Sequence, residues 1–222
     1  MASGKSILIL GASRGIGLGL AEEFARRGWH VVASERSRSE ALHALGDVEV
    51  VTADVTDPAS YADLDLADGS LDAVIVNAGI SGARHQSADK ATADEVAEVM
   101  LTNAFGPARA GRALLPALKR GGTLAFMSSL MGSVADSSGG YELYRSSKAA
   151  LNMLAKGIAE QDAKGREVEV LSLHPGWVQT DMGGPSATLT VAQSVSGLAD
   201  VVEGAGGGGH RFVDYTGKTL PF

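Results

Sequence analysis

The sequence of 222 residues contains no cysteine and has no excess of basic charge. The missing thiol excludes a disulfide-stabilised scaffold, a cysteine nucleophile and any cysteine-ligated zinc or iron–sulfur centre. With 19 basic and 26 acidic residues the net charge is −7. This charge disfavours nucleic acid as a partner, because proteins that bind nucleic acid generally present a basic face.

Long hydrophobic runs are also missing. No segment approaches the roughly 20 apolar residues that span a membrane, so we expect no membrane partner. The apolar run that follows the N-terminal residues 1–5 ends at Gly11, which is too early for a signal-peptide core of about 7 to 15 residues. We therefore expect a cytoplasmic protein. The five histidines are scattered and no side chains stand at metal-ligand spacing, so we expect no metal site.

Apolar runs alternate along the chain with longer amphipathic segments. We expect strands at residues 6–10, 29–33, 48–51, 71–76, 123–127, 168–173 and, at an edge, 210–213. We expect helices at residues 16–27, 39–45, 92–119 (bent at Gly106-Pro107), 142–162 and 192–203. This alternation predicts an α/β fold, a single Rossmann-type doubly wound and mostly parallel sheet with helices on both faces. No linker or repeat divides residues 1–222, which we expect to form one domain.

Glycine is abundant, with 29 residues that follow no collagen-like period. Three of them, Gly11, Gly15 and Gly17, lie where the first strand turns into the first helix. Such a turn can hold a diphosphate, because glycine allows close backbone approach and a helix N-terminus offers free N–H groups. Alternatively the glycines serve the turn alone. A P-loop is excluded because Gly4-Lys5-Ser6 has no upstream glycine at the required spacing. The glycine run at 204–209 stays unassigned.

The end of the second strand bears on the choice of dinucleotide. Glu35 would hold the adenosine ribose of NAD, whereas Arg36, together with Arg14 of the glycine loop, would accept the 2′-phosphate of NADP. Alternatively these three side chains are simply solvated. The two cations favour NADP over NAD as the cofactor.

Later motifs complete a recognisable set. The sequence continues with Asp54-Val55, Asn77-Ala78-Gly79, Asn103, Ser129, Tyr144-Arg145-Ser146-Ser147-Lys148 and Pro175-Gly176. With these motifs the chain resembles the short-chain dehydrogenase/reductase family over nearly its whole length. Residues 139–152, 174–184 and 214–221 resemble its C-factor-like branch. One departure is Leu10, where the family usually has a threonine that braces the loop.

The resemblance implies four catalytic residues, Asn103, Ser129, Tyr144 and Lys148. Tyr144 and Lys148 are four residues apart and share a helix face. A nearby ammonium and an oxidised nicotinamide would lower the pKa of Tyr144 below its usual value of about 10, making it a general acid and base. Ser129 would bind the substrate oxygen, Lys148 the nicotinamide ribose, and Asn103 a water that links Lys148 to solvent. Alternatively Asn103 caps or bends its helix.

For both the catalytic serine and the catalytic tyrosine, the sequence offers a second candidate close by. Ser128 and Ser129 are adjacent on a strand, so only one of them faces the site, and the family spacing to Gly132 favours Ser129. Tyr141 is the alternative to Tyr144, but its partner four residues on is Arg145, which cannot replace a tunable lysine. The long interval between Ser129 and Tyr144 predicts an extra turn at 137–140.

The resemblance also implies a cofactor site made of the glycine loop and the ends of later strands. Its residues are Gly11, Ser13, Arg14, Gly15, Ile16, Gly17, Glu35, Arg36, Asp54, Val55, Asn77, Ala78, Gly79, Tyr144, Lys148, Pro175, Gly176, Val178 and Thr180. Two of these residues could instead have a structural role: Asp54 would cap the next helix, and Asn77 would brace the sheet.

The connection at 183–189 is short, so we expect an open, shallow substrate site without a helical lid. Its candidate contacts are mostly apolar: Ile80, Leu130, Met131, Tyr141, Trp177 and Met182. They predict a small or medium carbonyl compound or a secondary alcohol as substrate.

Two other functions are alternatives to an oxidoreductase. A signalling or scaffold protein that binds a dinucleotide would not need the complete Ser129–Tyr144–Lys148 set. A serine hydrolase of the α/β type would need a G-x-S-x-G elbow, which is missing. The resemblance further implies a homodimer or homotetramer that pairs through the helices holding Asn103 and Tyr144.

Overall fold

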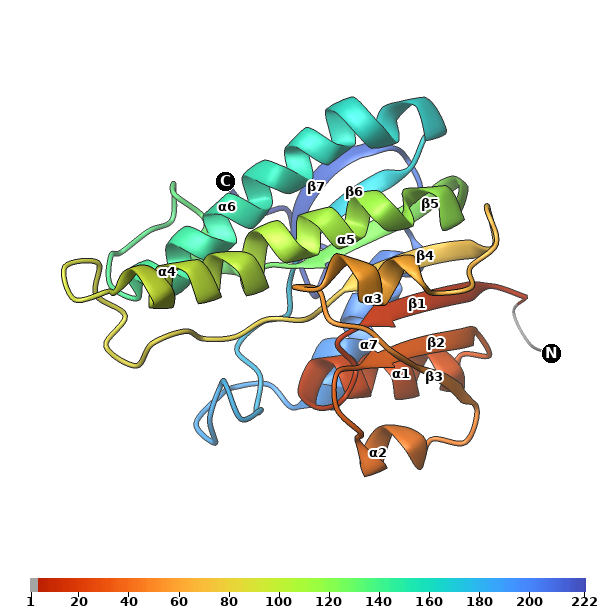
Figure 1. Cartoon of the computed structure of the whole chain (residues 1–222), viewed down its shortest axis with the longest axis horizontal. Helices are drawn as coiled ribbons and strands as arrows, with labels where there is room; N and C mark the ends of the chain where they lie inside the picture. Colours follow the sequence, from red (N-terminus) through yellow and green to blue (C-terminus); the bar gives the residue numbers. More distant parts are fainter. Residues whose placement is uncertain (1–3) are drawn as a thin grey trace.

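The computed structural model describes residues 4–222. It contains one parallel sheet with the strand order β3-β2-β1-β4-β5-β6-β7. The strands are β1 (Ser6–Leu10), β2 (His30–Glu35), β3 (Val48–Thr52), β4 (Leu71–Val76), β5 (Leu118–Met127), β6 (Glu169–His174) and β7 (Gly209–Asp214). The predicted doubly wound fold is therefore confirmed, and β7 is the expected edge strand (Figure 1).

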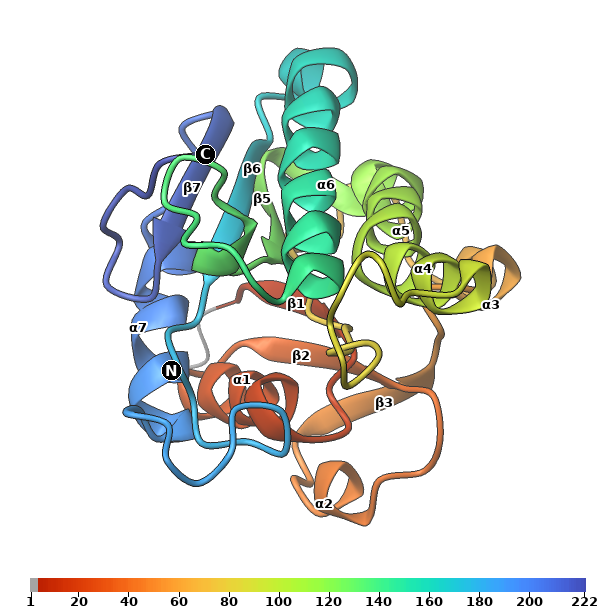
Figure 2. The ribbon, with the colours of Figure 1, turned by 90° about the vertical axis from the view of Figure 1, so that its left-hand side faces the viewer.

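Helices cover both faces of this sheet. They are α1 (Gly15–Arg26), α2 (Glu40–His43), α3 (Pro58–Ala62), α4 (Ala93–Met100), α5 (Gly106–Leu114), α6 (Glu142–Ile158) and α7 (Val191–Glu203). Figure 2 shows α1 and α7 on one face, with α4, α5 and α6 on the other.

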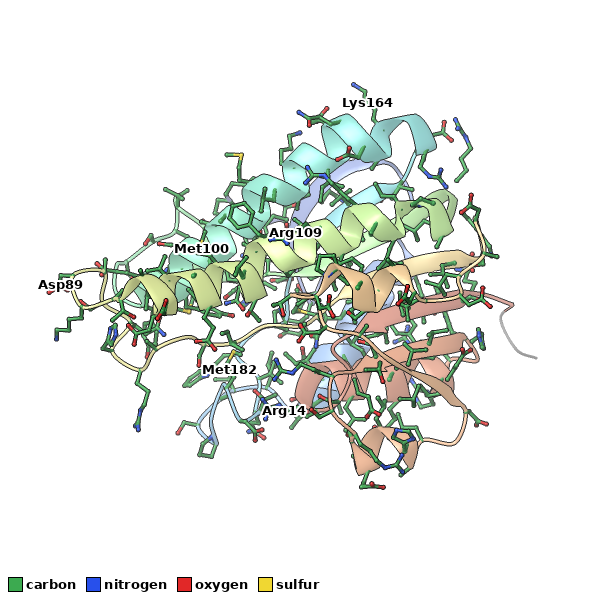
Figure 3. The ribbon with its side chains drawn as sticks, in the orientation of Figure 1. Arg14, Asp89, Met100, Arg109, Lys164 and Met182 are labelled. Atoms are coloured by element: carbon green, nitrogen blue, oxygen red, sulfur yellow. The ribbon has the colours of Figure 1, made fainter. Side chains whose placement is uncertain are left out.

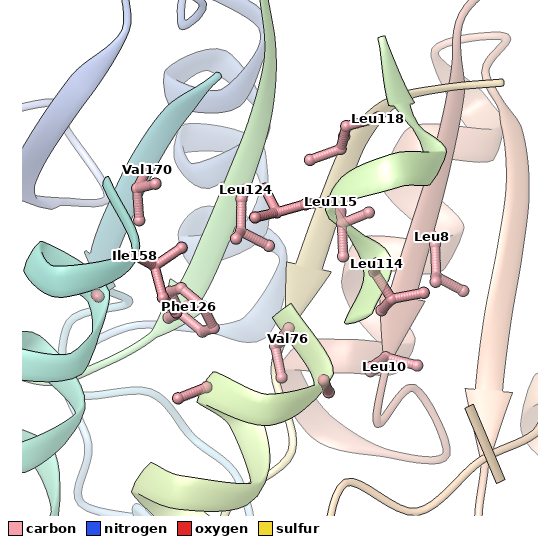
Figure 4. Close-up of a cluster of buried hydrophobic side chains, with 14 of the residues drawn as sticks. Leu8, Leu10, Val76, Leu114, Leu115, Leu118, Leu124, Phe126, Ile158 and Val170 are labelled. Atoms are coloured by element: carbon pink, nitrogen blue, oxygen red, sulfur yellow. The ribbon is translucent and has the colours of Figure 1, made fainter. Parts of the chain in front are cut away.

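Each face of the sheet has its own hydrophobic core. Because side chains alternate along a strand, Leu8 and Leu10 of β1 point to the α5–α6 side, while Ile7 and Ile9 point to the α1–α7 side. Figure 4 shows the first cluster, in which Phe126 is fully buried. Strands buried on both faces explain the continuous apolar runs in the sequence.

The strand order reverses between β1 and β4, and this reversal positions the site. Leu10 pairs with Val76, so the segments that follow these two strands leave the sheet side by side. The amide of Asn77 donates to the carbonyl of Leu10 at 2.9 Å. In open α/β sheets, ligands bind outside the carboxyl ends of the strands at such a reversal.

The long helix predicted at 92–119 is wrong in two respects. A π-helical turn, Leu101–Phe105, separates α4 from α5 just before the expected bend, and the helical region ends with a 3₁₀ turn at Leu115–Ala117. Pro116 lacks the N–H that a helix needs, and Leu118 already pairs with Leu71. Strand β5 therefore begins at 118 rather than at 123.

Two other helices differ from the prediction. The short helix α3 was missed, although Asp57 caps it and Pro58 stands at its first position, which are recognisable start signals. Helix α6 ends at Ile158 rather than at 162, and a π-helical turn, Ala159–Ala163, continues it.

The glycine run at 204–209 surrounds a buried carboxylate. The amides of Gly206 and Gly207 both donate to Oε2 of Glu169 at 2.7 Å, and Arg211 donates to Oε1 at 2.5 Å. Gly206 has a φ of 119°, which other residues rarely adopt. The run therefore satisfies a buried charge at the end of the sheet opposite to the glycine loop.

Candidate active site

The glycine loop between β1 and α1 lies against the segment that follows β4. A Cβ on Gly11 would lie 2.8 Å from the amide nitrogen of Ala78, and one on Gly17 would lie 2.1 Å from the carbonyl oxygen of Gly11. Real Cβ atoms essentially never come this close to backbone atoms. Close packing, and not only turn conformation, therefore requires these two glycines.

Two side chains from other elements hold the loop. Ser34 on β2 accepts a hydrogen bond from the amide of Gly11 at 2.9 Å, and Asn77 donates to the carbonyl of Gly11 at 2.7 Å. The sequence analysis missed Ser34, whose only signal is a small hydroxyl residue in an apolar strand. Ser34 supplies a hydroxyl to the loop in a chain that has Leu10 where a threonine was expected.

The first turn of α1 suits an anion. Its N-cap residue, Arg14, makes no side-chain capping bond, and no acidic residue lies in the first turn. The N-terminal N–H groups of a helix attract phosphate groups when no side chain neutralises them. The residues present therefore fit the diphosphate of a dinucleotide, held by the backbone of the glycine loop, with Ser13 and Ile16 as its neighbours.

Glu35 is engaged within the protein. It is only 7% exposed, accepts from the amide of Ser39 at 2.6 Å and lies 2.8 Å from Nε2 of His43. The hydrogen bond with His43, helped by that of Ser39, lowers the pKa of Glu35 below its usual value. This carboxylate therefore stabilises the turn between β2 and α2.

The two arginines of the cofactor prediction are exposed. Arg14 lies 3.3 Å from Asp181, and Arg36 lies 3.7 Å from Asp54. Both arginine side chains are at least three-quarters exposed, so these pairs hold them only weakly. Figure 3 shows Arg14 and Met182 at the same edge of the molecule, on the segments that follow β1 and β6.

Asp54 and Val55 follow β3. Oδ1 of Asp54 accepts from the amide and the hydroxyl of Thr56, both at 2.8 Å, so Asp54 shapes the turn after the strand. Val55 is buried in the α5–α6 core, and its carbonyl lies so close to Gly106 that a Cβ there would come within 2.6 Å.

The candidate catalytic side chains meet at the carboxyl end of β5. Helix α6 presents Tyr144 and Lys148 on one face, with Nζ of Lys148 5.6 Å from the centre of the Tyr144 ring. Nζ of Lys148 also donates to the carbonyl of Met127 at 2.8 Å. Ser129 follows two residues later, and its hydroxyl lies near enough to Tyr144 to act on the pKa of that phenol.

The neighbouring serine faces another way. The hydroxyl of Ser128 is buried and donates to Oδ1 of Asn152 at 2.7 Å, which ties β5 to α6. Only Ser129 of the two is brought to Tyr144. The segment between Ser129 and Tyr144 contains an exposed turn at 136–140, in the region where the sequence predicts one.

The pKa of Tyr144 lies above its ordinary value. In the protein alone, burial raises it to about 12, and the hydrogen bond with Ser129 opposes this only in part. In the protein alone the shift has only these two causes, and burial also reduces the pKa of Lys148, to about 8. The lowering of the Tyr144 pKa by Lys148 together with an oxidised nicotinamide stays a prediction for the protein with its cofactor.

Asn103 lies fully buried in the π-helical turn between α4 and α5. Its Oδ1 accepts from the amide of Ile80 at 2.8 Å, and its Nδ2 donates to the carbonyl of Ile80 and to the hydroxyl of Ser147. A Cβ on Gly79 would lie 3.3 Å from Oδ1 of Asn103 and 3.4 Å from Nζ of Lys148. Asn103 thus joins the segment after β4 to the catalytic helix, and π-turns of this kind are frequent at functional sites.

The segment that follows β6 folds back on itself. The carbonyl of Pro175 accepts from Ser194 of α7, Gly176 has a φ of 80°, and Val178 forms a bridge with Leu189. The hydroxyl of Thr180 accepts from the amide of Gly183 at 3.1 Å.

No helix covers residues 181–188, and Trp177 and Met182 are each 53% exposed. A cavity of about 640 Å³ lies between α7 and the chain around Tyr215, and none of the four catalytic candidates lines it. The segment after β6 therefore forms no helical lid, and this cavity lies apart from the catalytic candidates.

Two further structural results concern metal sites and membrane-spanning helices. Within residues 4–222 no group of three or more His, Asp or Glu side chains is arranged to hold a metal ion. In the same part of the chain, none of the helices has the length and apolar character needed to cross a bilayer.

The strand order of the parallel sheet reverses between β1 and β4, and a glycine loop lies at this reversal. Together with the neighbouring side chains of Ser129, Tyr144 and Lys148, this arrangement defines the class of dinucleotide-dependent oxidoreductases. The chain belongs to the short chain dehydrogenase family, whose sequence model matches residues 5–188. It is an NAD(P)-dependent dehydrogenase/reductase.

Its relatives agree with this assignment. The chain is 42% identical to the C-signal protein of Myxococcus xanthus over 158 residues, which cover 69% of this chain and 94% of the relative. It is similar to a short-chain dehydrogenase/reductase from Burkholderia multivorans with bound NADP (TM-score 0.92, 35% identity, 98% and 99% of the two chains). It is also similar to a carbonyl reductase from Pseudomonas aeruginosa PAO1 in complex with NADP (TM-score 0.88, 42% identity, 98% and 99% of the two chains).

Proposed function

We propose that the protein reduces a small or medium-sized carbonyl compound with NADPH, with Tyr144 as the proton donor. The observation that carries this proposal is the meeting of Ser129, Tyr144 and Lys148 at the carboxyl end of β5, beside the glycine loop. The reverse reaction oxidises a secondary alcohol with NADP.

The roles of the side chains follow from their positions. The hydroxyls of Ser129 and Tyr144 are neighbours, so both can donate to one carbonyl oxygen placed between them. When bound, the nicotinamide supplies the hydride to the carbonyl carbon. Tyr144 then gives its proton to the oxygen, and Lys148, whose Nζ lies 5.6 Å from the centre of the Tyr144 ring, would hold the nicotinamide ribose.

The pKa of Tyr144 favours reduction. At about 12, burial keeps the phenol protonated throughout the physiological range, so a proton is ready for transfer. Oxidation needs the phenolate instead, and burial disfavours it. We therefore expect reduction to be the efficient direction at neutral pH, and oxidation to improve as the pH rises.

NADP is the favoured cofactor of the two. Glu35, which would bind the free ribose of NAD, is engaged by Ser39 and His43. Arg14 and Arg36 are exposed and held only by weak ion pairs, so they are available to a 2′-phosphate. The relatives from Burkholderia multivorans and Pseudomonas aeruginosa, which contain NADP, support the same choice.

The substrate is expected to be modest in size and mostly apolar. The predicted substrate contacts Tyr141, Trp177 and Met182 are each more than half exposed, and the segment at 181–188 forms no helical lid. The carbonyl reductase among the similar structures supports this class of substrate.

The test is to follow oxidation of NADPH and NADH by a panel of aldehydes and ketones. We expect Tyr144→Phe to lose at least about a hundredfold in kcat while NADP still binds, since one positioned proton donor contributes about 10²–10⁴-fold. Arg36→Ala should raise the KM for NADPH and leave that for NADH unchanged. Full turnover by Tyr144→Phe would rule out the proposed mechanism.

A signalling role is the second candidate, favoured by the 42% identity to the C-signal protein. In that case the dinucleotide would be bound without being consumed in turnover. The same assay separates the two candidates, because a pure sensor would bind NADPH and oxidise none with any carbonyl in the panel.

The protein is further proposed to form a homodimer or homotetramer. Supporting it, the helical segments that hold Asn103 and Tyr144 expose large apolar side chains, namely Val96, Leu101, Phe105 and Met153. Isolated apolar side chains are common on protein surfaces, whereas a group on neighbouring helices is typical of an interface.

A further inference from the structure

The catalytic helix α6 begins without a cap of its own. Its N-cap residue, Tyr141, has a φ of 49° and makes no side-chain capping bond. The first N–H groups of a helix need acceptors from elsewhere in the chain. Two of them find such acceptors in Gln86, which lies far away in sequence. The amide of Glu142 donates to the carbonyl of Gln86 at 2.9 Å, and the amide of Tyr144 donates to its side-chain Oε1 at 3.0 Å.

Gln86 is itself held in an unusual conformation. Its φ of 56° lies in the left-handed region. Residues other than glycine seldom adopt this conformation, and those that do cluster at functional sites. Its Nε2 donates to the carbonyls of Ser81 and Ala83, both at 2.7 Å. The side-chain amide therefore uses both of its hydrogens on its own loop and its oxygen on the helix.

The loop that carries Gln86 is one wall of the site. It begins at Ile80, which Asn103 holds by two hydrogen bonds of 2.8 Å. A third hydrogen bond joins it to the helix, because the amide of Ala88 donates to Oε2 of Glu142 at 2.6 Å. Figure 2 shows this loop, in yellow, beside the end of α6 where the helix begins.

We propose that Gln86 is a positioning residue for Tyr144, a role that rests on the proposed function. Its oxygen fixes the backbone N–H of the residue that donates the proton, and its two donated bonds fix that oxygen. Losing the acceptor frees the first turn of α6 and lets the tyrosine hydroxyl move from Ser129. Misplacement of a reacting group by about 1 Å can reduce the rate about a hundredfold.

The experiment compares Gln86→Met with Glu142→Ala. Gln86→Met keeps the length of the side chain and removes its three hydrogen bonds, one of them to Tyr144. Glu142→Ala cuts the other side-chain hydrogen bond between the same loop and the same helix, that from Ala88, without touching the Tyr144 amide. We expect kcat to fall about tenfold or more in Gln86→Met, with the KM for NADPH unchanged, and to fall no more than about twofold in Glu142→Ala.

Gln86→Glu provides a second readout. Its carboxylate can still accept from the Tyr144 amide but can no longer donate to the carbonyls of Ser81 and Ala83, so hydrogen exchange at that amide should be faster than in wild type and slower than in Gln86→Met. The new negative charge beside the first turn of α6 disfavours the phenolate and should raise the pKa of Tyr144. The alkaline limb of the kcat profile should therefore move to higher pH, a change that loss of loop packing alone would not produce.

The outcomes separate the two proposals. If wild-type protein reduces no carbonyl, or Tyr144→Phe stays fully active, the proposed function fails, whatever the Gln86 variants do. If wild type is active, Tyr144→Phe is inactive, and Gln86→Met matches Glu142→Ala in kcat and exchange, the positioning role of Gln86 is overturned.

Discussion

At the scale of single residues, burial determines the chemistry of the site more than charge does. Lys148 is fully enclosed, and burial lowers its pKa to about 8. Within residues 4–222 it has no acidic partner closer than 4 Å, and its one protein hydrogen bond goes to the carbonyl of Met127. A buried ammonium without a carboxylate is unfavourable for folding, so this lysine reduces the stability of the folded protein.

Replacing this lysine should therefore stabilise the protein. We expect Lys148→Met to raise the free energy of unfolding at pH 7 by about 1–2 kcal/mol, the relief of desolvation less the lost hydrogen bond. Turnover should be lost. Chemical denaturation measured beside the NADPH assay tests both effects.

The gain in stability expected of Lys148→Met should decrease as the pH rises. The pKa of the lysine is about 10.4 in the unfolded chain and about 8 in the folded protein. Between these values the unfolded state binds more protons, so wild-type stability rises with pH. The advantage of Lys148→Met should be full below about pH 8 and disappear as the pH approaches 10. A constant or growing advantage would contradict this account.

At the scale of elements, local patterns located the strands and helices, and long-range packing set their limits. The helix predicted at 92–119 is divided by a π-helical turn that brings Asn103 to Ile80 and Ser147. Its end is set by pairing of Leu118 with Leu71, which no local pattern reveals. By contrast, the turn of the glycine loop follows from local sequence, because three closely spaced glycines stand directly after a buried strand.

The glycines of two helices provide a matched test of close packing. In α1, a Cβ on Gly17 would lie 2.1 Å from the carbonyl of Gly11 and 2.6 Å from Nδ2 of Asn77. In α6, a Cβ on Gly157 would meet nothing within 4 Å. Gly17→Ala should destabilise the protein by about 2 kcal/mol or more through strain and should abolish NADP binding. Gly157→Ala should stabilise it by about 0.5–1 kcal/mol, because alanine favours helix.

Thermal melts and NADP titration of both variants check this prediction. Wild-type cofactor affinity in Gly17→Ala would mean that the glycine loop is not held as closely as the contacts with Gly11 and Asn77 indicate.

At the scale of the whole molecule, the sheet gathers residues from distant parts of the chain at one edge. The glycine loop follows β1, Asn77 follows β4, Ser129 follows β5 and Pro175 follows β6. Parallel strands all end at the same edge, which explains why the motifs are spread along the sequence and still meet.

The same scale includes association of copies of the chain. If the protein pairs through α4 and α6, Met153→Glu should lower the mass measured by light scattering, since Met153 is 73% exposed on α6. Val134→Glu is the matched control, because Val134 is 75% exposed on a loop outside these helices. A monomeric wild type, or equal effects of the two variants, would refute pairing through this surface.

The sequence by itself determined the fold class and the family, and it indicated the residues that we propose for the chemistry. Their relations are local: Tyr144 and Lys148 share a face because a helix repeats every 3.6 residues, and Ser128 and Ser129 alternate because a strand repeats every two. Only the tertiary structure decided the rest. Glu35 is engaged by His43, Ser34 holds the glycine loop, and Gln86 caps a helix that begins far along the chain. Such contacts, and the burial that sets the pKa values of Tyr144 and Lys148, depend on packing between segments that no local pattern relates.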